Sequence, residues 1–221
     1  MKRILVIAPH ADDEFIGVGG TIIKEIENGN EVYVCIVTKG MPPLFTEAVA
    51  NNIQSEAKKC HAEAKIKKTY FLDFPAVMLE EQHRYIVNDK ILEVIEEVKP
   101  DEVYIPHFGD MQKDHQIVAD ACMVTLRPKY SFSPKRIYAY ETLSETGWNV
   151  PSASNAFIPN RFVDISEQLD EKIRCMGFYK SQLYSFPNAR SIEAIIHLAK
   201  YRGSLMNIHA AEAFMVIREI D

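Results

Sequence analysis

Three absences limit the classes of protein to which this sequence can belong. It has four scattered cysteines, Cys35, Cys60, Cys122 and Cys175, and because none forms a C-x-x-C pair, a cysteine zinc site or a dithiol redox motif is excluded. The apolar run after the basic start covers only residues 4–8, too short for a signal-peptide core or a membrane span. Positive charge is also in deficit: the net charge is -6, which excludes the basic surface typical of nucleic-acid or anionic-membrane binding. We therefore expect a cytoplasmic protein with no membrane span and no nucleic-acid partner.

What is present is the composition of an ordinary folded domain, with 47% apolar and 25% charged residues. The 221 residues suffice for one sizeable core and contain no repeat or linker, so we expect a single domain over residues 1–221. Short β-branched runs alternate with amphipathic stretches. This predicts an α/β fold, a Rossmann-like, doubly wound, mostly parallel sheet with helices on both faces. The expected strands are 2–8, 32–37, 69–72, 103–105, 136–140 and 214–217. The expected helices are 15–28, 51–63, 83–98, 115–126, 166–180 and 191–202, with a loop at 147–160.

The run Pro9-His10-Ala11-Asp12-Asp13-Glu14 directly follows the first predicted strand. Ligands of open α/β sheets bind at the carboxyl ends of the strands, so a binding site is expected at this loop. One imidazole and three carboxylates within five residues attract a cation and repel a phosphate. A simpler interpretation is that the acids only begin a helix, where the helix dipole favours negative charge.

A second polar cluster, residues 106–115, follows the fourth predicted strand. In a doubly wound sheet the loops after the first and fourth strands open at the same edge. Two imidazoles and a carboxylate suit a catalytic zinc, which takes three protein ligands and keeps one position for water. We predict His10, Asp13 and His115 as the metal ligands and Asp12 as the general base that deprotonates water at the metal. Asp114 and His115 also suit the start of a helix, and capping is compatible with metal binding.

Gly17, Gly19 and Gly20 raise the alternative of a nucleotide-binding Rossmann-like protein without hydrolytic activity. The glycines of a dinucleotide loop open the turn directly after the strand. In this chain acids fill that turn, and they repel a pyrophosphate. Close packing of the first helix on the sheet explains the glycines more simply.

Together these motifs resemble those of the PIG-L/LmbE-like de-N-acetylase family. The resemblance rests on residues 10–14, 17–21 and 110–115 and continues through 141–148, 180–182, 202–203 and 211–214. It implies zinc-dependent removal of the acetyl group from an N-acetyl amino sugar, either a GlcNAc-type conjugate or a sugar nucleotide. It also implies the same three ligands and the same base. Another divalent metal such as Fe²⁺, a thiol-type or other sugar conjugate as substrate, and a homo-oligomer stay open.

Two positions depart from the family pattern. Ala11 replaces a proline that sets backbone shape rather than chemistry. Gln112 replaces a histidine to which the family assigns oxyanion stabilisation or protonation of the leaving amine. Gln112 can donate a hydrogen bond to an oxyanion but cannot supply a proton. We therefore assign catalytic roles to Gln112 and to His107, the histidine that could substitute, beside Asp12.

Three further residues are predicted to bind substrate. Asp110 belongs to the second motif, and His209 lies in the C-terminal segment that resembles the family. Trp148 lies in a loop rich in Ser and Asn, and an aromatic ring can stack on a sugar, although a lone tryptophan is more often part of the packing. A family member that binds a glycan without cleaving it is the remaining alternative.

Overall fold

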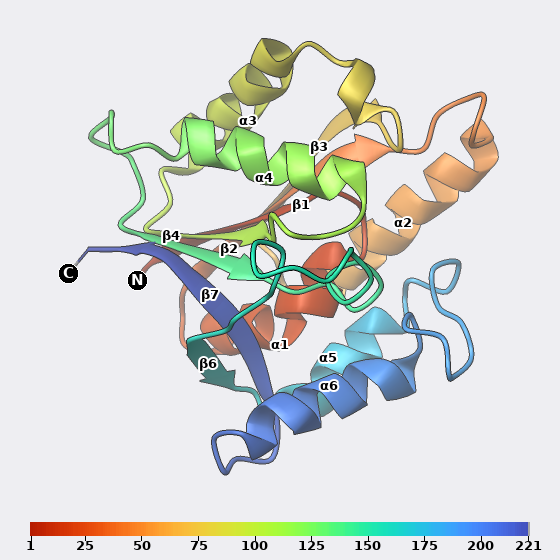
Figure 1. Cartoon of the computed structure of the whole chain (residues 1–221), viewed down its shortest axis with the longest axis vertical. Helices are drawn as coiled ribbons and strands as arrows, with labels where there is room; N and C mark the ends of the chain where they lie inside the picture. The colour runs from red at the N-terminus through yellow and green to blue at the C-terminus, as the bar shows by residue number, and fades with distance from the viewer. Residues whose placement is uncertain (221) are drawn as a thin grey trace.

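The computed structural model describes residues 1–220, which form a seven-stranded sheet in the order β3-β2-β1-β4-β5-β7-β6, with helices on both sides (Figure 1). The strands are β1 (Arg3–Ala8), β2 (Glu31–Lys39), β3 (Lys68–Pro75), β4 (Glu102–Pro106), β5 (Arg136–Tyr140), β6 (Arg161–Asp164) and β7 (Ala211–Glu219). The helices are α1 (Asp13–Glu27), α2 (Glu47–Glu63), α3 (Arg84–Val98), α4 (Lys113–Thr125), α5 (Leu169–Met176) and α6 (Ile192–Ser204), with a 3₁₀ turn η1 (Leu79–Glu81).

Strands β1 to β5 are parallel, and the sheet ends in two antiparallel pairs, β5 with β7 and β7 with β6. The expected α/β, mostly parallel, doubly wound fold is therefore confirmed. The chain winds from β1 outward to β3 and then crosses to β4 on the other side of β1. The order reverses between β1 and β4, which is where a ligand crevice forms in sheets of this kind.

The alternation of side chains along the buried strands produces two hydrophobic cores. Ile4 and Val6 of β1 face a core shared with α1, α2, α5 and α6, whereas Leu5 and Ile7 face a core shared with α3 and α4. Figure 1 shows the same division, with α3 and α4 above the sheet and α1, α5 and α6 below it. Burial on both faces explains why these strands read as continuous apolar runs.

Two elements differ from their expected form. The helix expected at 166–180 is shorter: α5 covers Leu169–Met176, and Gly177 follows it. The four-residue strand β6 was not expected, since it is an edge strand that pairs only with β7 and has no full period of alternation. No helix within residues 1–220 has both the length and the apolar composition needed to cross a bilayer.

The packing role expected for the glycines of the first helix is confirmed at Gly17. A Cβ atom at this position would lie 2.3 Å from the ring of Tyr140 on β5, so only glycine lets α1 approach the sheet this closely. The start of α1 is thereby fixed over the carboxyl ends of β1 and β5, where the polar loop residues gather.

Candidate metal centre

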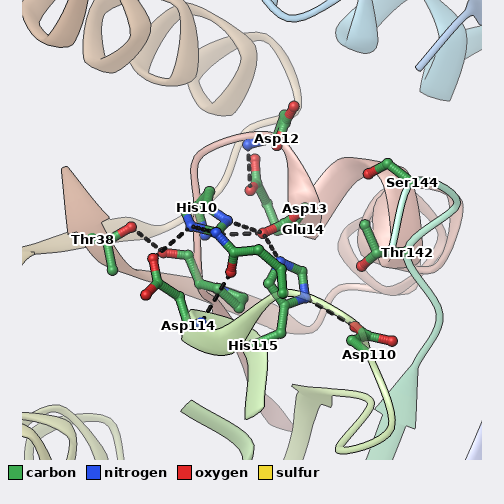
Figure 2. A network of polar contacts seen from close by, with 12 residues as sticks. His10, Asp12, Asp13, Glu14, Thr38, Asp110, Asp114, His115, Thr142 and Ser144 are labelled. Atoms are coloured by element: carbon green, nitrogen blue, oxygen red, sulfur yellow. Dashed lines mark hydrogen bonds and ion pairs between the residues drawn. The ribbon is translucent and has the colours of Figure 1, made fainter. Parts of the chain in front are cut away.

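The three predicted metal ligands come together at the carboxyl edge of the sheet. His10 and Asp13 follow β1, and His115 lies in the first turn of α4, just after β4. One ligand atom from each of the three residues lies within 4.8 Å of the others, and Asp13 and His115 are buried. Figure 2 shows the three side chains converging from the two loops.

The Asp13 carboxylate is the centre of this cluster. Its Oδ2 atom accepts a 2.9 Å hydrogen bond from the backbone N–H of His10 and lies 3.2 Å from His10 Nδ1 and 3.2 Å from His115 Nε2. Both imidazoles therefore turn one ring nitrogen toward the same oxygen. The arrangement brings two nitrogen donors and one oxygen donor to a common point.

A second carboxylate lies behind each imidazole. Asp110 Oδ2 lies 2.9 Å from Nδ1 of His115, and Asp114 Oδ2 lies 3.0 Å from Nε2 of His10. Such partners fix the orientation of metal-binding imidazoles and raise their basicity. We expected Asp110 to bind substrate. Instead it is fully buried on the far side of His115 from Asp13 (Figure 2). Its other oxygen accepts a 2.6 Å hydrogen bond from Thr146.

The residues of the cluster fit a divalent metal ion. Asp13 Oδ1 and His115 Nε2 are buried and have no hydrogen-bond partner within residues 1–220, which is costly unless another group binds there. Two neutral imidazoles and a carboxylate form the donor set of catalytic zinc sites, and non-haem Fe(II) sites use the same set. His10, Asp13 and His115 would hold the ion.

The charges of the cluster residues strongly shift one another's pKa values. Burial favours the neutral form of Asp13, but the facing His115 and His10 outweigh burial and hold the pKa of Asp13 well below its usual range. Burial lowers the pKa of His115, whereas Asp13 and Asp110 raise it, with a net result of about 10. Because metals bind the neutral imidazole, metal binding must displace a proton from His115.

Asp12 is buried beside the cluster but outside the ligand set. It precedes α1 with a φ of 116°, a conformation that few residues other than glycine adopt. Neither carboxylate oxygen accepts a hydrogen bond from the described part of the chain. Burial raises the pKa of Asp12 to about 8, although the Arg190 guanidinium, 3.0 Å from Asp12 Oδ2, opposes the rise.

A pocket of about 310 Å³ opens onto the cluster and is lined by His10, Gln112 and Arg190, with Thr38, Glu145 and Gln182 among the other residues. Gln112, to which we assigned a catalytic role, is therefore one of the residues that line the pocket. Its Oε1 accepts the backbone N–H of Asp114 at 3.0 Å and caps α4, and its Nε2 lies 3.2 Å from His10 Nε2.

Comparison with known proteins identifies the family to which these residues belong. Residues 5–126 match the family model described as PIG-L: GlcNAc-PI de-N-acetylase, which covers both halves of the metal cluster. The chain belongs to the PIG-L family. The family resemblance inferred from the sequence motifs is thus confirmed.

Among curated relatives, this PIG-L protein is 28% identical over 192 residues to diacetylchitobiose deacetylase of Thermococcus kodakarensis (82% of this chain, 70% of the relative). It is also 28% identical over 193 residues to a probable N-acetyl-alpha-D-glucosaminyl L-malate deacetylase 2 of Bacillus cereus (82% of this chain, 84% of the relative). The solved structure of N,N'-diacetylchitobiose deacetylase from Pyrococcus horikoshii shares its fold, with a TM-score of 0.79 at 22% identity (98% of this chain, 84% of that chain).

Three residues assigned to the site of this PIG-L protein lie apart from the metal cluster. The His107 side chain is buried, donates to the backbone oxygen of Asn155 at 3.0 Å and packs edge-on against Phe157. Trp148 is 76% exposed in the loop after β5 and does not line the pocket. His209 lines a separate groove with Asp164 and other residues near the start of β7.

Sequence reasoning missed Arg190 and Asp114 as parts of this PIG-L site. Asp114 lies next to a predicted ligand, and its partnership with His10 depends on the relative position of two loops. Arg190 lies in the segment between α5 and α6, far along the chain from the metal motifs. No local pattern around Arg190 indicates a site, because its role comes only from where the fold places it.

Proposed function

We propose that this PIG-L protein is a metal-dependent deacetylase that hydrolyses the N-acetyl group of an amino-sugar conjugate. One observation carries the proposal: a cluster of two histidines and one aspartate, of which His10 lines the pocket, adjoins Asp12, a buried carboxylate that accepts no hydrogen bond from residues 1–220. The relatives named as deacetylases of diacetylchitobiose and of an N-acetyl-glucosaminyl malate support the same reaction class.

Bound zinc, or another divalent ion such as Fe²⁺, would act as a Lewis acid that polarises the acetamide carbonyl and lowers the pKa of water. Asp12 is the general base in this proposal. Neither of its oxygens accepts a hydrogen bond from residues 1–220, which leaves their lone pairs for a water proton.

The reaction balances with residues of this chain as the proton carriers. The water oxygen bonds to the carbonyl carbon while its proton passes to Asp12, and the carbonyl π electrons move onto the oxygen. When the C–N bond breaks, its electron pair goes to nitrogen, which takes the proton back from Asp12. Gln112 has no proton to give, so a single carboxylate serves in both directions. The pair on the oxygen re-forms the carbonyl bond as the amine leaves, and the acetic acid gives its remaining proton to solvent, so the products are acetate and a free amine.

The volume and the lining of the pocket indicate a small substrate. A volume of about 310 Å³ lies at the small end of the range for ligand sites and suits one sugar ring with its acetamide. Polar side chains such as Gln54, Gln112 and Gln182 line the pocket and match the hydroxyl groups of a sugar. The conjugate beyond the first ring would extend toward the open mouth.

The test measures acetate released from a panel of N-acetyl amino sugars, their disaccharides, malate conjugates and sugar nucleotides, with the zinc-loaded and the iron-loaded protein. At least one substrate should be turned over, and Asp12→Asn should lower kcat by about 100-fold or more while one metal ion per chain is retained. Asp120→Asn, which alters an exposed carboxylate on α4, serves as the control and should keep full activity.

Two results would overturn parts of the proposal independently. Undiminished turnover by Asp12→Asn would remove Asp12 as the base. Stoichiometric metal in the double variant His10→Ala, His115→Ala, measured by mass spectrometry, would remove these histidines as ligands. A protein that binds metal but releases no acetate from the whole panel would refute the deacetylase function itself.

A further inference from the structure

Arg190 is the one arginine or lysine among residues 1–220 that forms ion pairs with the carboxylates of Asp12 and Asp13. Its Nη1 lies 3.0 Å from Asp12 Oδ2, and its Nη2 lies 3.8 Å from Asp13 Oδ1. The first carboxylate belongs to the proposed base and the second to a proposed metal ligand. The guanidinium therefore borders the point at which the reacting atoms of a substrate would meet.

Two further side chains hold this guanidinium in place. Arg190 Nε donates a 3.1 Å hydrogen bond to Ser144 after β5, and Nη1 donates a 3.4 Å bond to Gln182 after α5. The side chain is 21% exposed and lines the pocket. Because the guanidinium is planar and is held at two of its nitrogen atoms, its remaining N–H bonds have a fixed direction. Electrostatic stabilisation requires this kind of preorganisation.

The hydrogen bonds of Arg190 to the protein leave some of its N–H donors unused, and the residue lines the pocket. No hydrogen bond from Nη2 is found within residues 1–220, and the contact with Asp12 is an ion pair in which neither carboxylate oxygen accepts a hydrogen bond. Gln112, the other donor near the cluster, uses its oxygen to cap α4 and has its nitrogen against His10. Arg190 is thus the group with unused N–H bonds beside both carboxylates.

We propose that Arg190 is a catalytic residue whose Nη2 donates hydrogen bonds to the acetamide oxygen as that oxygen gains negative charge. This inference rests on the proposed deacetylase function. When water adds to the carbonyl carbon, the π electron pair moves onto the oxygen, and the arginine stabilises that charge without giving up a proton. When the C–N bond breaks, the pair returns to the carbon–oxygen bond and the same oxygen leaves in acetate.

The ion pair between Arg190 and Asp12 is also compatible with a second role for the arginine. An arginine that only orients Asp12 would be a positioning residue, and its loss would lower kcat far more than it lowers the affinity of the site for a tetrahedral anion. The loss of a direct donor to the oxygen must lower both kcat and the affinity for a tetrahedral anion. Methylphosphonate is a suitable probe, because it is a small tetrahedral anion with a methyl group where acetate has one.

The experiment compares the metal-loaded wild type with Arg190→Met, Arg190→Lys and the control Arg202→Met. Arg202 is also a partly buried, paired arginine, but its partner is Glu141, outside the metal cluster. We expect Arg190→Met to lower kcat by about 100-fold or more with KM changed less than about threefold. Its affinity for methylphosphonate, measured by calorimetry, should fall about 10- to 100-fold. Arg190→Lys should recover part of both losses, and the control should show neither.

Folding and metal content are checked by circular dichroism and mass spectrometry. If Arg190→Met does not fold, Arg190→Lys carries the comparison, since lysine keeps the charge but loses the planar fork. A lowered kcat with unchanged methylphosphonate affinity would overturn the proposal, and so would no change in either. If the wild type releases no acetate at all, the deacetylase function fails and the catalytic role fails with it. A loss of methylphosphonate affinity would then leave Arg190 as an anion-binding group only.

Discussion

Each imidazole of the metal cluster has a carboxylate on its outer side, which orients the ring. Asp110 binds His115, while Asp114 binds His10 and also accepts the backbone N–H of Val77 at 2.6 Å. Asp114 therefore ties the loop after β3 to the site. Burial favours the neutral Asp114, but the hydrogen bonds from His10 and Val77 outweigh it and lower the pKa of this carboxyl.

We predict that Asp110→Ala weakens metal binding by about 10- to 100-fold, because His115 loses the partner that orients its ring. The metal dissociation constant is measured by competition with a chelator. Thr146→Val removes the hydroxyl that bonds the other Asp110 oxygen and should have a smaller effect. Equal affinity in Asp110→Ala and the wild type would show that His115 is held by its packing alone.

Glu14 is the centre of a buried hydrogen-bond network that contacts the Asp12 backbone. Its Oε2 accepts the backbone N–H of Asp12 at 3.1 Å, and its Oε1 bonds Tyr179 and lies 3.0 Å from His61 Nε2. This buried network holds the Asp12 backbone in its unusual conformation. Because Tyr179 lies in the segment after α5, the base is fixed by a residue that no local motif connects to it.

Tyr179→Phe should therefore lower the free energy of unfolding by about 1–3 kcal/mol, since a buried carboxylate loses a donor without gaining solvent. Urea denaturation measures the loss. The Tyr184→Phe variant, altered at an exposed tyrosine, should unfold like the wild type. A loss below about 0.5 kcal/mol in Tyr179→Phe would mean that His61 alone satisfies Glu14.

At the scale of elements, helix α1 is clamped by two side chains from other parts of the chain. Glu212 of β7 accepts the backbone N–H groups of Gly20 and Thr21 at 2.8 and 2.7 Å, and Lys172 of α5 donates to the backbone oxygen of Ile16 at 2.8 Å. Lys172 and Glu212 also pair with each other at 2.6 Å and are both buried. The pair joins α1, α5 and β7 beneath the site.

Lys172→Met should cost about 3–5 kcal/mol of unfolding free energy, because it leaves the Glu212 carboxylate buried without its counter-ion. Urea denaturation of the metal-free protein tests this. The double variant Lys172→Met, Glu212→Gln removes the buried charge as well and should recover part of the loss. If Lys172→Met costs less than about 1 kcal/mol, the backbone N–H groups of α1 satisfy Glu212 without the lysine.

The elements differ in how well the sequence predicts them. Strands β1, β2, β4 and β5 are mostly buried and read as short apolar runs, and helices α1 to α4 show the helical spacing of a face packed on the sheet. Strand β6 and the limits of α5 were missed, since pairing with β7 and packing on α1 decide them. The same division holds at the site. The cluster of His10, Asp13 and His115 follows from strand-end motifs, whereas Arg190 and Glu212 come from segments whose placement only the fold determines.

At the scale of the whole molecule, the metal cluster joins two parts of the sheet. Its ligands follow β1 and β4, the neighbouring strands between which the strand order reverses. In the unfolded chain, His10 and His115 lie far apart in sequence and cannot form the same site. A metal ion that binds only the folded chain must therefore stabilise it.

We predict that zinc at 100 times its dissociation constant raises the free energy of unfolding by about 2.7 kcal/mol relative to the chelator-treated protein. Urea denaturation at several zinc concentrations gives the value, and the gain should grow with the logarithm of free zinc. The double variant His10→Ala, His115→Ala should show no such gain, while His83→Ala, which alters a histidine before α3, should respond like the wild type. An equal gain in the double variant would mean that zinc stabilises the fold from another site and that the cluster between β1 and β4 is not the zinc site.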